Sequence, residues 1–217
     1  MIGDFVYAPP AGLTIVYEDQ DLLVIDKASG LLSVPGRKPE HHDSAEQRAK
    51  RHCAQALVLH RLDMDTSGIM VFAKKKKAQK FLARHFQERL VKKIYEARVA
   101  ERVDQNDGIV DLPLMTDWPK RPLQKIDHDE GKPALTIWRV LDREKIHTRV
   151  ELRPRTGRSH QLRIHMMAMG HPILGDRFYA PKHIIDEAER LNLHARSLTL
   201  THPRSKEEMT FEAEVPF

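Results

Sequence analysis

The sequence predicts an α+β fold built on a mixed, largely antiparallel sheet with flanking helices and loops. Helical and strand-like patterns are mixed along the chain without the strict βαβ alternation of a parallel sheet. Several short apolar runs are joined by polar turns, as in antiparallel hairpins. The 217 residues contain no repeat, low-complexity segment or long Gly/Ser linker, and they suffice for one substantial core.

The first third of the chain predicts a hairpin, a helix and two further strands. Residues 14–17 and 22–25 are β-rich runs separated by the acidic turn EDQD. Ser44 and Gln47 form the Ser-x-x-Gln pattern of a capping box, which opens a helix expected to reach about residue 56. Short apolar runs at 57–59 and 69–73 predict strands on either side of the loop HRLDMDTSG.

Two more helices and the remaining strands are predicted after that loop. Apolar residues recur at helical spacing between residues 78 and 86, and again between 160 and 169, where Gly170 stands at the position that ends a helix. The stretch 104–126 contains DG, LP, WP and RP pairs, so we expect it to be irregular with short strands at most. Further strands are expected at 94–99, 135–141, 148–152, 197–201 and 209–213.

Basic residues are unevenly distributed along the chain. Lysine and arginine number 36 against 31 acids, which gives a formal net charge of +5 and a pI of about 9.3. Basic clusters stand at 74–77, 92–93 and 153–163, whereas acids are enriched at 127–130 and 207–214. A one-sided basic surface suits a polyanion such as nucleic acid. For the run KKKK alone, a solvated helix face is the simpler interpretation.

The composition and the N-terminal residues favour a cytoplasmic protein. No apolar run approaches the ~20 residues needed to span a bilayer. The N-terminal stretch MIGDFVYAPPAG lacks the basic segment followed by an apolar segment that is typical of a signal peptide. Cys53 is the single cysteine, which rules out an internal disulfide and a multi-cysteine zinc site. We therefore expect a reducing, cytoplasmic setting and no membrane partner.

Metal and nucleotide sites find little support in the motifs. From Asp63, DMDTSG begins like a calcium loop, but its twelfth position is Lys74 and not a bidentate glutamate. His160 and His165 are five residues apart, which leaves them ~140° apart on a helix, whereas the two-histidine zinc motif needs a spacing of four. The glycine-rich phosphate loops and the G-x-S-x-G elbow are absent. We expect neither a metal nor a cofactor.

Local sequence alone leaves two interpretations of HRLDMDTSG open. Asp63 or Asp65 caps the turn before the next strand, as turn aspartates commonly do. Alternatively, one of the two aspartates performs chemistry, with His60 and Arg61 tuning or orienting it.

Three separated stretches resemble the RluA-type pseudouridine synthases. They are HRLDMDTSGIMVFA at 60–73, KKIYEARV at 92–99 and RPRTGRSHQLRIHMMAMGHPILGDRFYA at 153–180. Supporting stretches place the resemblance over nearly the whole chain, in family order, and Ala28 departs from the family's usual proline in its KPxG turn. The resemblance implies the pseudouridine synthase fold around a central RNA-binding cleft. It also implies one catalytic domain over residues 1–217, with 1–12 as an N-terminal extension and no S4-type domain.

The resemblance implies a catalytic role for Asp63, Tyr95 and Arg163. Asp63 is the essential carboxylate, and Arg163 is the cation that keeps it ionised and orients it. Tyr95 stacks on the target base or moves a proton, although a tyrosine in a strand also packs as an ordinary aromatic. Asp65 falls at a position that varies in the family, so we interpret it as an exposed turn residue, with 66–68 building the turn.

The same resemblance implies a set of RNA-binding residues. A uridine inside structured RNA must be flipped out before a carboxylate reaches it. Arg61 and His60 are expected to fill the vacated stack or hold a phosphate, with bracing of the loop as the alternative for His60. Leu193 is expected to form an apolar wall opposite Tyr95 or to pack in the core. Phosphate contacts are expected from Arg155, Arg158 and His160.

The implied function is an isomerase that converts specific uridines of structured RNA to pseudouridine. The short chain and DLPLMTDWPKRPLQK at 111–125 resemble the dual-specificity subgroup. Its targets are a 23S rRNA hairpin (uridine 746 type) and tRNA anticodon stem-loops (uridine 32 type). We expect RNA as the partner and a monomer. The alternatives are a non-catalytic RNA-binding or RNA-chaperone protein on the same fold and, with poor ligand spacing, a metal-dependent nuclease.

Overall fold

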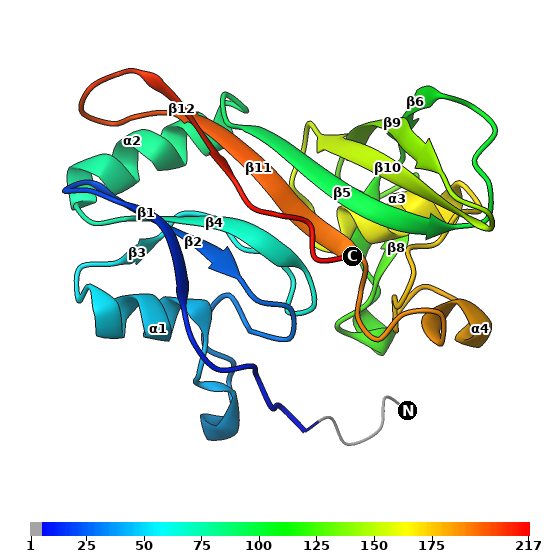
Figure 1. Ribbon diagram of the computed structural model, residues 1–217, viewed down its shortest axis with the longest axis horizontal. Coiled ribbons are helices and arrows are strands. Elements are labelled where there is room, and N and C mark those ends of the chain that lie inside the picture. Colours follow the sequence, from blue (N-terminus) through cyan, green and yellow to red (C-terminus); the bar gives the residue numbers. More distant parts are fainter. Residues whose placement is uncertain (1–5) are drawn as a thin grey trace. The chain divides into compact units, whose positions relative to one another are not determined.

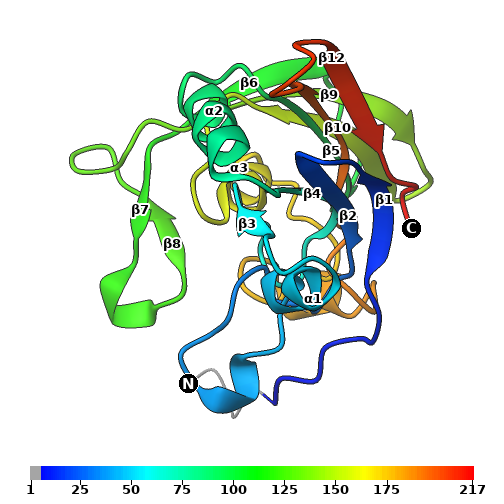
Figure 2. The same cartoon turned by 90° about the vertical axis from the view of Figure 1, so that its left-hand side faces the viewer.

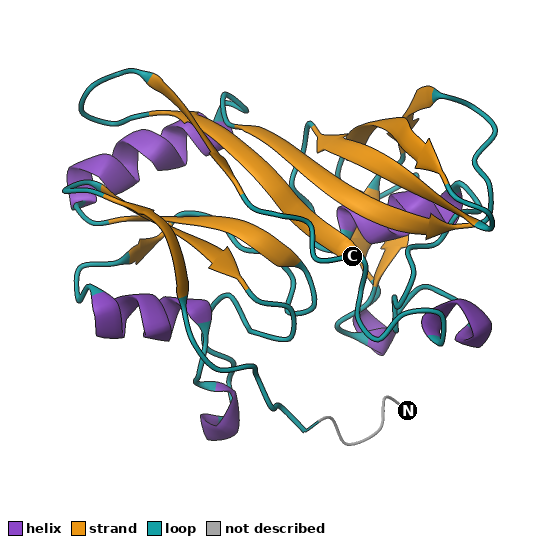
Figure 3. Ribbon diagram, viewed as in Figure 1, coloured by secondary structure: helices purple, strands orange, loops and turns teal. Residues whose placement is uncertain are grey.

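The computed structural model describes residues 6–217, which divide into two compact units. Unit 1 contains the chain up to Val91 together with Ser197–Glu214, and unit 2 contains Lys92–Arg196 and Val215–Phe217. Strands predominate and helices are few, so the predicted α+β class is confirmed (Figure 3). Residues 1–5 of the expected N-terminal extension lie outside the described residues.

The strands of unit 1 are paired antiparallel, as the hairpin pattern near the N-terminus predicts. β1 pairs with β2, β2 with β4, β3 with β4, and β11 with β12. These strands are β1 (Thr14–Glu18), β2 (Leu22–Lys27), β3 (Leu57–Val58), β4 (Ser67–Ala73), β12 (Glu208–Glu212) and, from Ser197 on, β11 (Leu193–Thr201).

The described part of unit 1 contains two α-helices, one in each of the two places where the sequence predicts a helix. α1 (Ala45–His52) is capped by Ser44, whose hydroxyl accepts a hydrogen bond from the Gln47 amide at 3.3 Å. It ends before the predicted residue 56, because Cys53 already has extended backbone angles. α2 (Lys76–Gln87) follows β4. A short 3-10 helix, η1 (Pro39–His41), precedes α1.

The core of unit 1 surrounds β2 and β4. α1 and α2 lie on opposite sides of these strands in both views (Figures 1 and 2). Val24 and Val71 pack in one cluster with Leu82 of α2, while the alternate positions along each strand point to the other face. Because both faces are covered, all seven residues of β4 are buried.

Unit 2 is built on a four-stranded antiparallel sheet in the order β5-β10-β9-β6. β7 and β8 form a separate two-stranded hairpin, which stands apart from these strands in Figure 2. The stretch expected to be irregular thus holds short strands. The strands are β5 (Lys92–Ala100), β6 (Asp107–Asp111), β7 (Leu114–Thr116), β8 (Gln124–Ile126), β9 (Leu135–Arg143) and β10 (His147–Pro154).

The helices of unit 2 are α3 (Gln161–Ala168), α4 (Lys182–Ile185) and the 3-10 helix η2 (Trp118–Lys120). Leu162 of α3 packs into the main core cluster of this unit with residues of β5 and β10. Gly170 has a φ of 85° and ends α3 as predicted. Within residues 6–217, no helix has the length and apolar character needed to cross a membrane.

Candidate functional site

The backbone of the loop that carries Asp63 is held by serines from the loop after β2. The Ser33 hydroxyl donates to the Leu62 carbonyl at 2.6 Å and accepts from the Leu62 amide at 3.0 Å. Ser29 donates to the carbonyl of Asp65 at 2.6 Å. These bonds fix the chain immediately before and after Asp63, which is itself half-buried.

Lys27 also holds the backbone of this loop, and its side chain is fully buried. Its ammonium donates to the carbonyls of Ala28, Leu31 and Met64 at 2.9, 2.7 and 2.9 Å. The amide of Gly30 also donates to Met64, at 3.0 Å. A buried ammonium is tolerated only when its donors are satisfied. The departure from proline at Ala28 leaves these contacts in place.

The turn lies slightly earlier than expected. The amide of Thr66 donates to the Asp63 carbonyl at 3.2 Å, so the bend falls at Met64 and Asp65. The prediction that 66–68 build the turn is wrong for its last two residues, since β4 begins at Ser67. Asp65 is half-buried and not exposed.

His60 and Arg61 have different surroundings. His60 Nε2 accepts a hydrogen bond from the Val71 amide at 3.1 Å, and its ring stacks on Phe86 of α2 at 5.0 Å between centroids. These contacts support the bracing alternative for His60. Arg61 is exposed, as an RNA-contacting residue must be.

In unit 2, Tyr95 and Leu193 belong to one apolar environment. Leu193 is 3% exposed and lies in the main core cluster, and the half-buried Tyr95 packs against that cluster. Tyr95 also stands opposite Leu152 in the β5–β10 pairing. Core packing is therefore the observed role of Leu193, in the cluster against which Tyr95 packs.

Arg163 forms a buried, bidentate ion pair with Asp176. Its Nε and Nη2 donate to the two carboxylate oxygens at 2.8 and 2.5 Å, and both side chains are at most 2% exposed. Asp176 also accepts from the amides of Phe178 and Tyr179 at 3.0 and 3.3 Å. Asp176 was not among the predicted site residues, although the dipeptide Gly-Asp within GHPILGDRFYA contains it. A pair of this geometry fixes the plane of the guanidinium.

The preceding residue, Gly175, explains how Asp176 reaches its partner. Its φ is 71°, and a Cβ there would stand 2.1 Å from the carbonyl oxygen of Arg190. Only glycine fits this close backbone approach. The turn that presents Asp176 to Arg163 therefore depends on a residue with no side chain.

His160 and Arg163 share an aromatic neighbourhood. The guanidinium carbon of Arg163 lies 4.9 Å and 5.3 Å from the ring centroids of Phe178 and Tyr179. His160 Nδ1 is 2.5 Å from the Tyr179 hydroxyl. His160 also has a left-handed backbone, with a φ of 54°, a conformation that often marks functional positions. It is half-buried, and its role toward RNA stays a prediction.

A buried amide organises the loop between β10 and α3. The Gln161 side-chain oxygen accepts from the Thr156 hydroxyl at 2.8 Å and from the Arg158 amide at 3.0 Å. Its nitrogen donates to the Leu135 carbonyl at 3.1 Å and to the Thr136 hydroxyl at 3.0 Å. All four hydrogen-bonding positions of the amide are thereby used. These bonds tie the loop to β9.

Arg155 and Arg158 have no carboxylate partner within residues 6–217. Arg155 is exposed, and Arg158 is half-buried with its Nε donating to the Pro133 carbonyl at 3.1 Å. Their uncompensated charges fit the prediction of phosphate contacts.

His165 is a structural residue. Its Nε2 donates to the Leu112 carbonyl at 3.1 Å, so its Nδ1 accepts from the Thr136 hydroxyl at 2.9 Å. Burial lowers the pKa of the imidazole and keeps it neutral. In the part of the chain that the structure describes, no group of three or more His, Cys, Asp or Glu side chains is placed to hold a metal ion.

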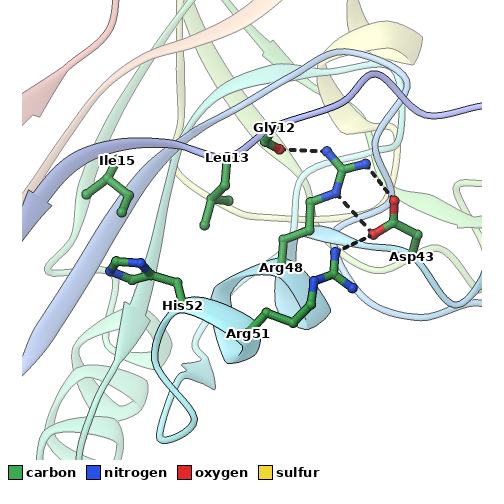
Figure 4. A pocket seen from close by; sticks show the side chains of 7 residues that line it. All are labelled: Gly12, Leu13, Ile15, Asp43, Arg48, Arg51 and His52. Carbon is green, nitrogen blue, oxygen red and sulfur yellow. Dashed lines mark hydrogen bonds and ion pairs between the residues drawn. The ribbon is translucent and has the colours of Figure 1, made fainter.

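An open hollow in unit 1 is separate from the predicted site residues (Figure 4). There Arg48 donates to both oxygens of Asp43 at 3.0 and 2.6 Å and to the Gly12 carbonyl at 2.7 Å. The Arg48 guanidinium lowers the pKa of Asp43 to about 2. These polar groups satisfy one another and tie the segment before β1 to α1. The lining residues are Gly12, Leu13, Ile15, Asp43, Arg48, Arg51 and His52.

Comparison with known proteins identifies this combination of motifs and fold. Residues 21–168 match the family model described as RNA pseudouridylate synthase. The chain is 52% identical over 214 residues to the dual-specificity RNA pseudouridine synthase RluA of Escherichia coli strain K12, covering 97% of this chain and 98% of that protein. The protein of that name from Vibrio vulnificus is 51% identical over 207 residues, covering 92% of this chain and 82% of its own.

Two solved structures of pseudouridylate synthase domains also resemble this chain. Human RNA pseudouridylate synthase domain containing 1 superposes with a TM-score of 0.80 at 28% identity, over 97% of this chain and 87% of that one. Human RNA pseudouridylate synthase domain containing 4 gives 0.74 at 27% identity, over 94% and 88%. The fold and the motifs define an isomerase. The chain belongs to the RNA pseudouridylate synthase family, and the predicted fold is confirmed.

Proposed function

We propose that this protein converts uridine to pseudouridine in two kinds of RNA, a 23S rRNA hairpin and tRNA anticodon stem-loops. The observation that carries the dual specificity is the 52% identity, over 97% of the chain, to a relative whose name states dual specificity. The enzyme acts as a monomer with one catalytic domain, in the cytoplasm, where these RNAs mature. It needs neither metal nor cofactor.

Asp63 starts the reaction in this proposal. The N1–C1′ bond of the uridine breaks, the base turns, and a C5–C1′ bond forms while C5 loses its proton and N1 gains one. The atoms balance without an oxidant, a reductant or an energy source. Asp63 stands between backbone groups held by Ser33 and Ser29. A carboxylate on a loop held in this way is pre-organised for attack or proton transfer.

Arg163 and Tyr95 complete the catalytic group. The ion pair with Asp176 holds the Arg163 guanidinium in one plane, and we assign it the task of orienting the Asp63 carboxylate. Tyr95 is half-buried and packs against the core of unit 2, so its ring is a rigid platform for the target base. Leu193 supports this platform from within the core.

The remaining predicted residues are assigned to RNA binding. Arg155, Arg158 and His160 hold phosphates along the loop before α3. Arg61 enters the stack that the flipped uridine leaves, and His60 braces the loop beneath it. The exposure of Arg61 and Arg155 supports these assignments.

Release of tritium from RNA labelled at C5 of uracil tests the function directly. The protein is incubated separately with unmodified tRNA and with a 23S rRNA fragment, without metal or nucleotide. Release from both RNAs supports dual specificity. Release from only one RNA shows that the dual specificity is wrong and that this RNA is the single target of the two. Binding without release from any RNA favours the non-catalytic RNA-binding alternative. An absolute requirement for Mg²⁺ or ATP contradicts the proposed chemistry.

A further inference from the structure

Lys93 lies on the face of β5 that carries Tyr95. Successive side chains of a strand point to opposite faces, so residues two apart share a face. Lys92 is exposed, whereas Lys93 and Tyr95 are both half-buried. A group bound against the ring of Tyr95 therefore lies on the same side of β5 as the side chain of Lys93.

The ammonium of Lys93 stands beside the loop before α3. Its nitrogen lies 3.7 Å from the point where a Cβ of Gly157 would be. Gly157 lies in the loop that carries Arg155 and Arg158, neither of which has a carboxylate partner in the described part of the chain. With no side chain at Gly157, the space in front of the ammonium stays open to a ligand.

Lys93 differs from the lysines of unit 1 that are paired with acids. Lys74 and Lys75 make ion pairs with Glu18 and Asp21 at 2.6 and 3.3 Å. Within residues 6–217, Lys93 makes no ion pair and no side-chain hydrogen bond. Its partial burial disfavours the charged form and lowers its pKa. An ammonium in this situation gains most from a ligand that brings a negative charge.

We propose that Lys93 binds a phosphate of the RNA substrate, next to the base that meets Tyr95. The inference rests on the proposed function, because it takes RNA as the ligand. A phosphodiester fits better than a carbonyl oxygen of uracil, since a neutral acceptor leaves the charge of Lys93 uncompensated. Arg155 and Arg158 extend the same positive surface along the loop. The contact belongs to unit 2 alone.

The test compares Lys93→Met with Lys93→Arg and a matched control, Lys145→Met. Lys145 is exposed in the turn between β9 and β10, at the other end of β10 from Gly157, and its loss removes the same charge. Dissociation constants are measured between 50 and 400 mM KCl with a transcribed tRNA anticodon stem-loop and a 23S rRNA hairpin. We expect Lys93→Met to bind roughly tenfold more weakly at about 0.1 M salt. The slope of the logarithm of the binding constant against the logarithm of the salt concentration, called the salt slope below, should become shallower by about 0.7.

Lys93→Arg should recover most of the affinity, and Lys145→Met should change it little. Weaker binding with an unchanged salt slope overturns the phosphate assignment in favour of a contact to the base. Unchanged binding by Lys93→Met overturns the inference altogether. The melting temperature separates binding from folding, because removing a desolvated charge without a partner should preserve or raise it. If the wild-type protein isomerises no RNA, the proposed function fails, but the salt slopes of these variants still decide the role of Lys93.

Discussion

The side-chain hydroxyl of Ser33 lies between the amide and the carbonyl of Leu62. It donates to the carbonyl at 2.6 Å and accepts from the amide at 3.0 Å, and both residues are buried. One hydroxyl thus satisfies both backbone groups of the residue immediately before Asp63. The position of the proposed catalytic carboxylate depends on a side chain 30 residues earlier in the sequence.

Ser33→Ala should therefore affect both stability and turnover. The change leaves a buried amide and a buried carbonyl without partners, which should lower the free energy of unfolding by about 1–3 kcal/mol. The loop then loses its pre-organisation, so kcat should fall more than RNA affinity. Urea unfolding and tritium-release kinetics measure the two effects. Ser29→Ala removes a single bond and should show a smaller loss, and equal effects of the two variants would contradict this argument.

The two aspartates of HRLDMDTSG should behave differently. Asp63→Asn keeps the shape but removes the charge, and we expect tritium release to fall by roughly 10⁴-fold or more. Asp65→Asn, two residues away in the same turn, should retain activity within about threefold. Both variants should bind RNA like the wild type, which direct binding measurements establish. Full activity in Asp63→Asn would show that another group starts the reaction.

The pair of Arg163 and Asp176 gives a prediction about coupling. Asp176→Asn keeps an acceptor but removes the charge opposite a buried guanidinium, and we expect a loss of about 3 kcal/mol in the free energy of unfolding. Replacing both residues, with Arg163→Met added, should restore part of that loss because the buried guanidinium that lacks its carboxylate is then also removed. A double-mutant cycle followed by urea unfolding measures the coupling. A coupling energy near zero would show that the pair contributes nothing specific.

His165 should make folding stability depend on pH near neutrality. Burial lowers its pKa below the usual 6.5, so the unfolded chain binds the proton more readily than the folded one. The stability that neutral His165 contributes is present above about pH 6.5 and is lost as the pH falls below it. Urea unfolding at pH 7.5 and 5.5 should show this loss in the wild type and less of it in His165→Gln. His128→Gln, at an exposed position, should keep the wild-type dependence.

The stretch RTGRSHQLRIH shows how far the sequence could be interpreted. Its helical pattern and Gly170 correctly predict α3 and its end, because helix periodicity and helix termination are local properties. The pattern could not separate the residues that face solvent from those that hold the loop. Gln161 and His165 prove to be buried structural residues, and Arg163 is held by Asp176, 13 positions away. The partners of these side chains lie on other segments, whose positions only the folded chain determines.

By itself, the sequence determined the fold class, the order of the strands and helices, the family and the loop that carries Asp63. These follow from periodicities of two and 3.6 residues and from motifs whose residues are close together along the chain. The tertiary structure decided which side chains hold that loop, where its turn lies, and that Arg163 has a buried carboxylate partner. It also placed the ammonium of Lys93 beside Gly157. Apart from the turn, each of these contacts joins segments far apart in sequence. Burial gives such contacts their energetic weight because water no longer competes for the same donors and charges.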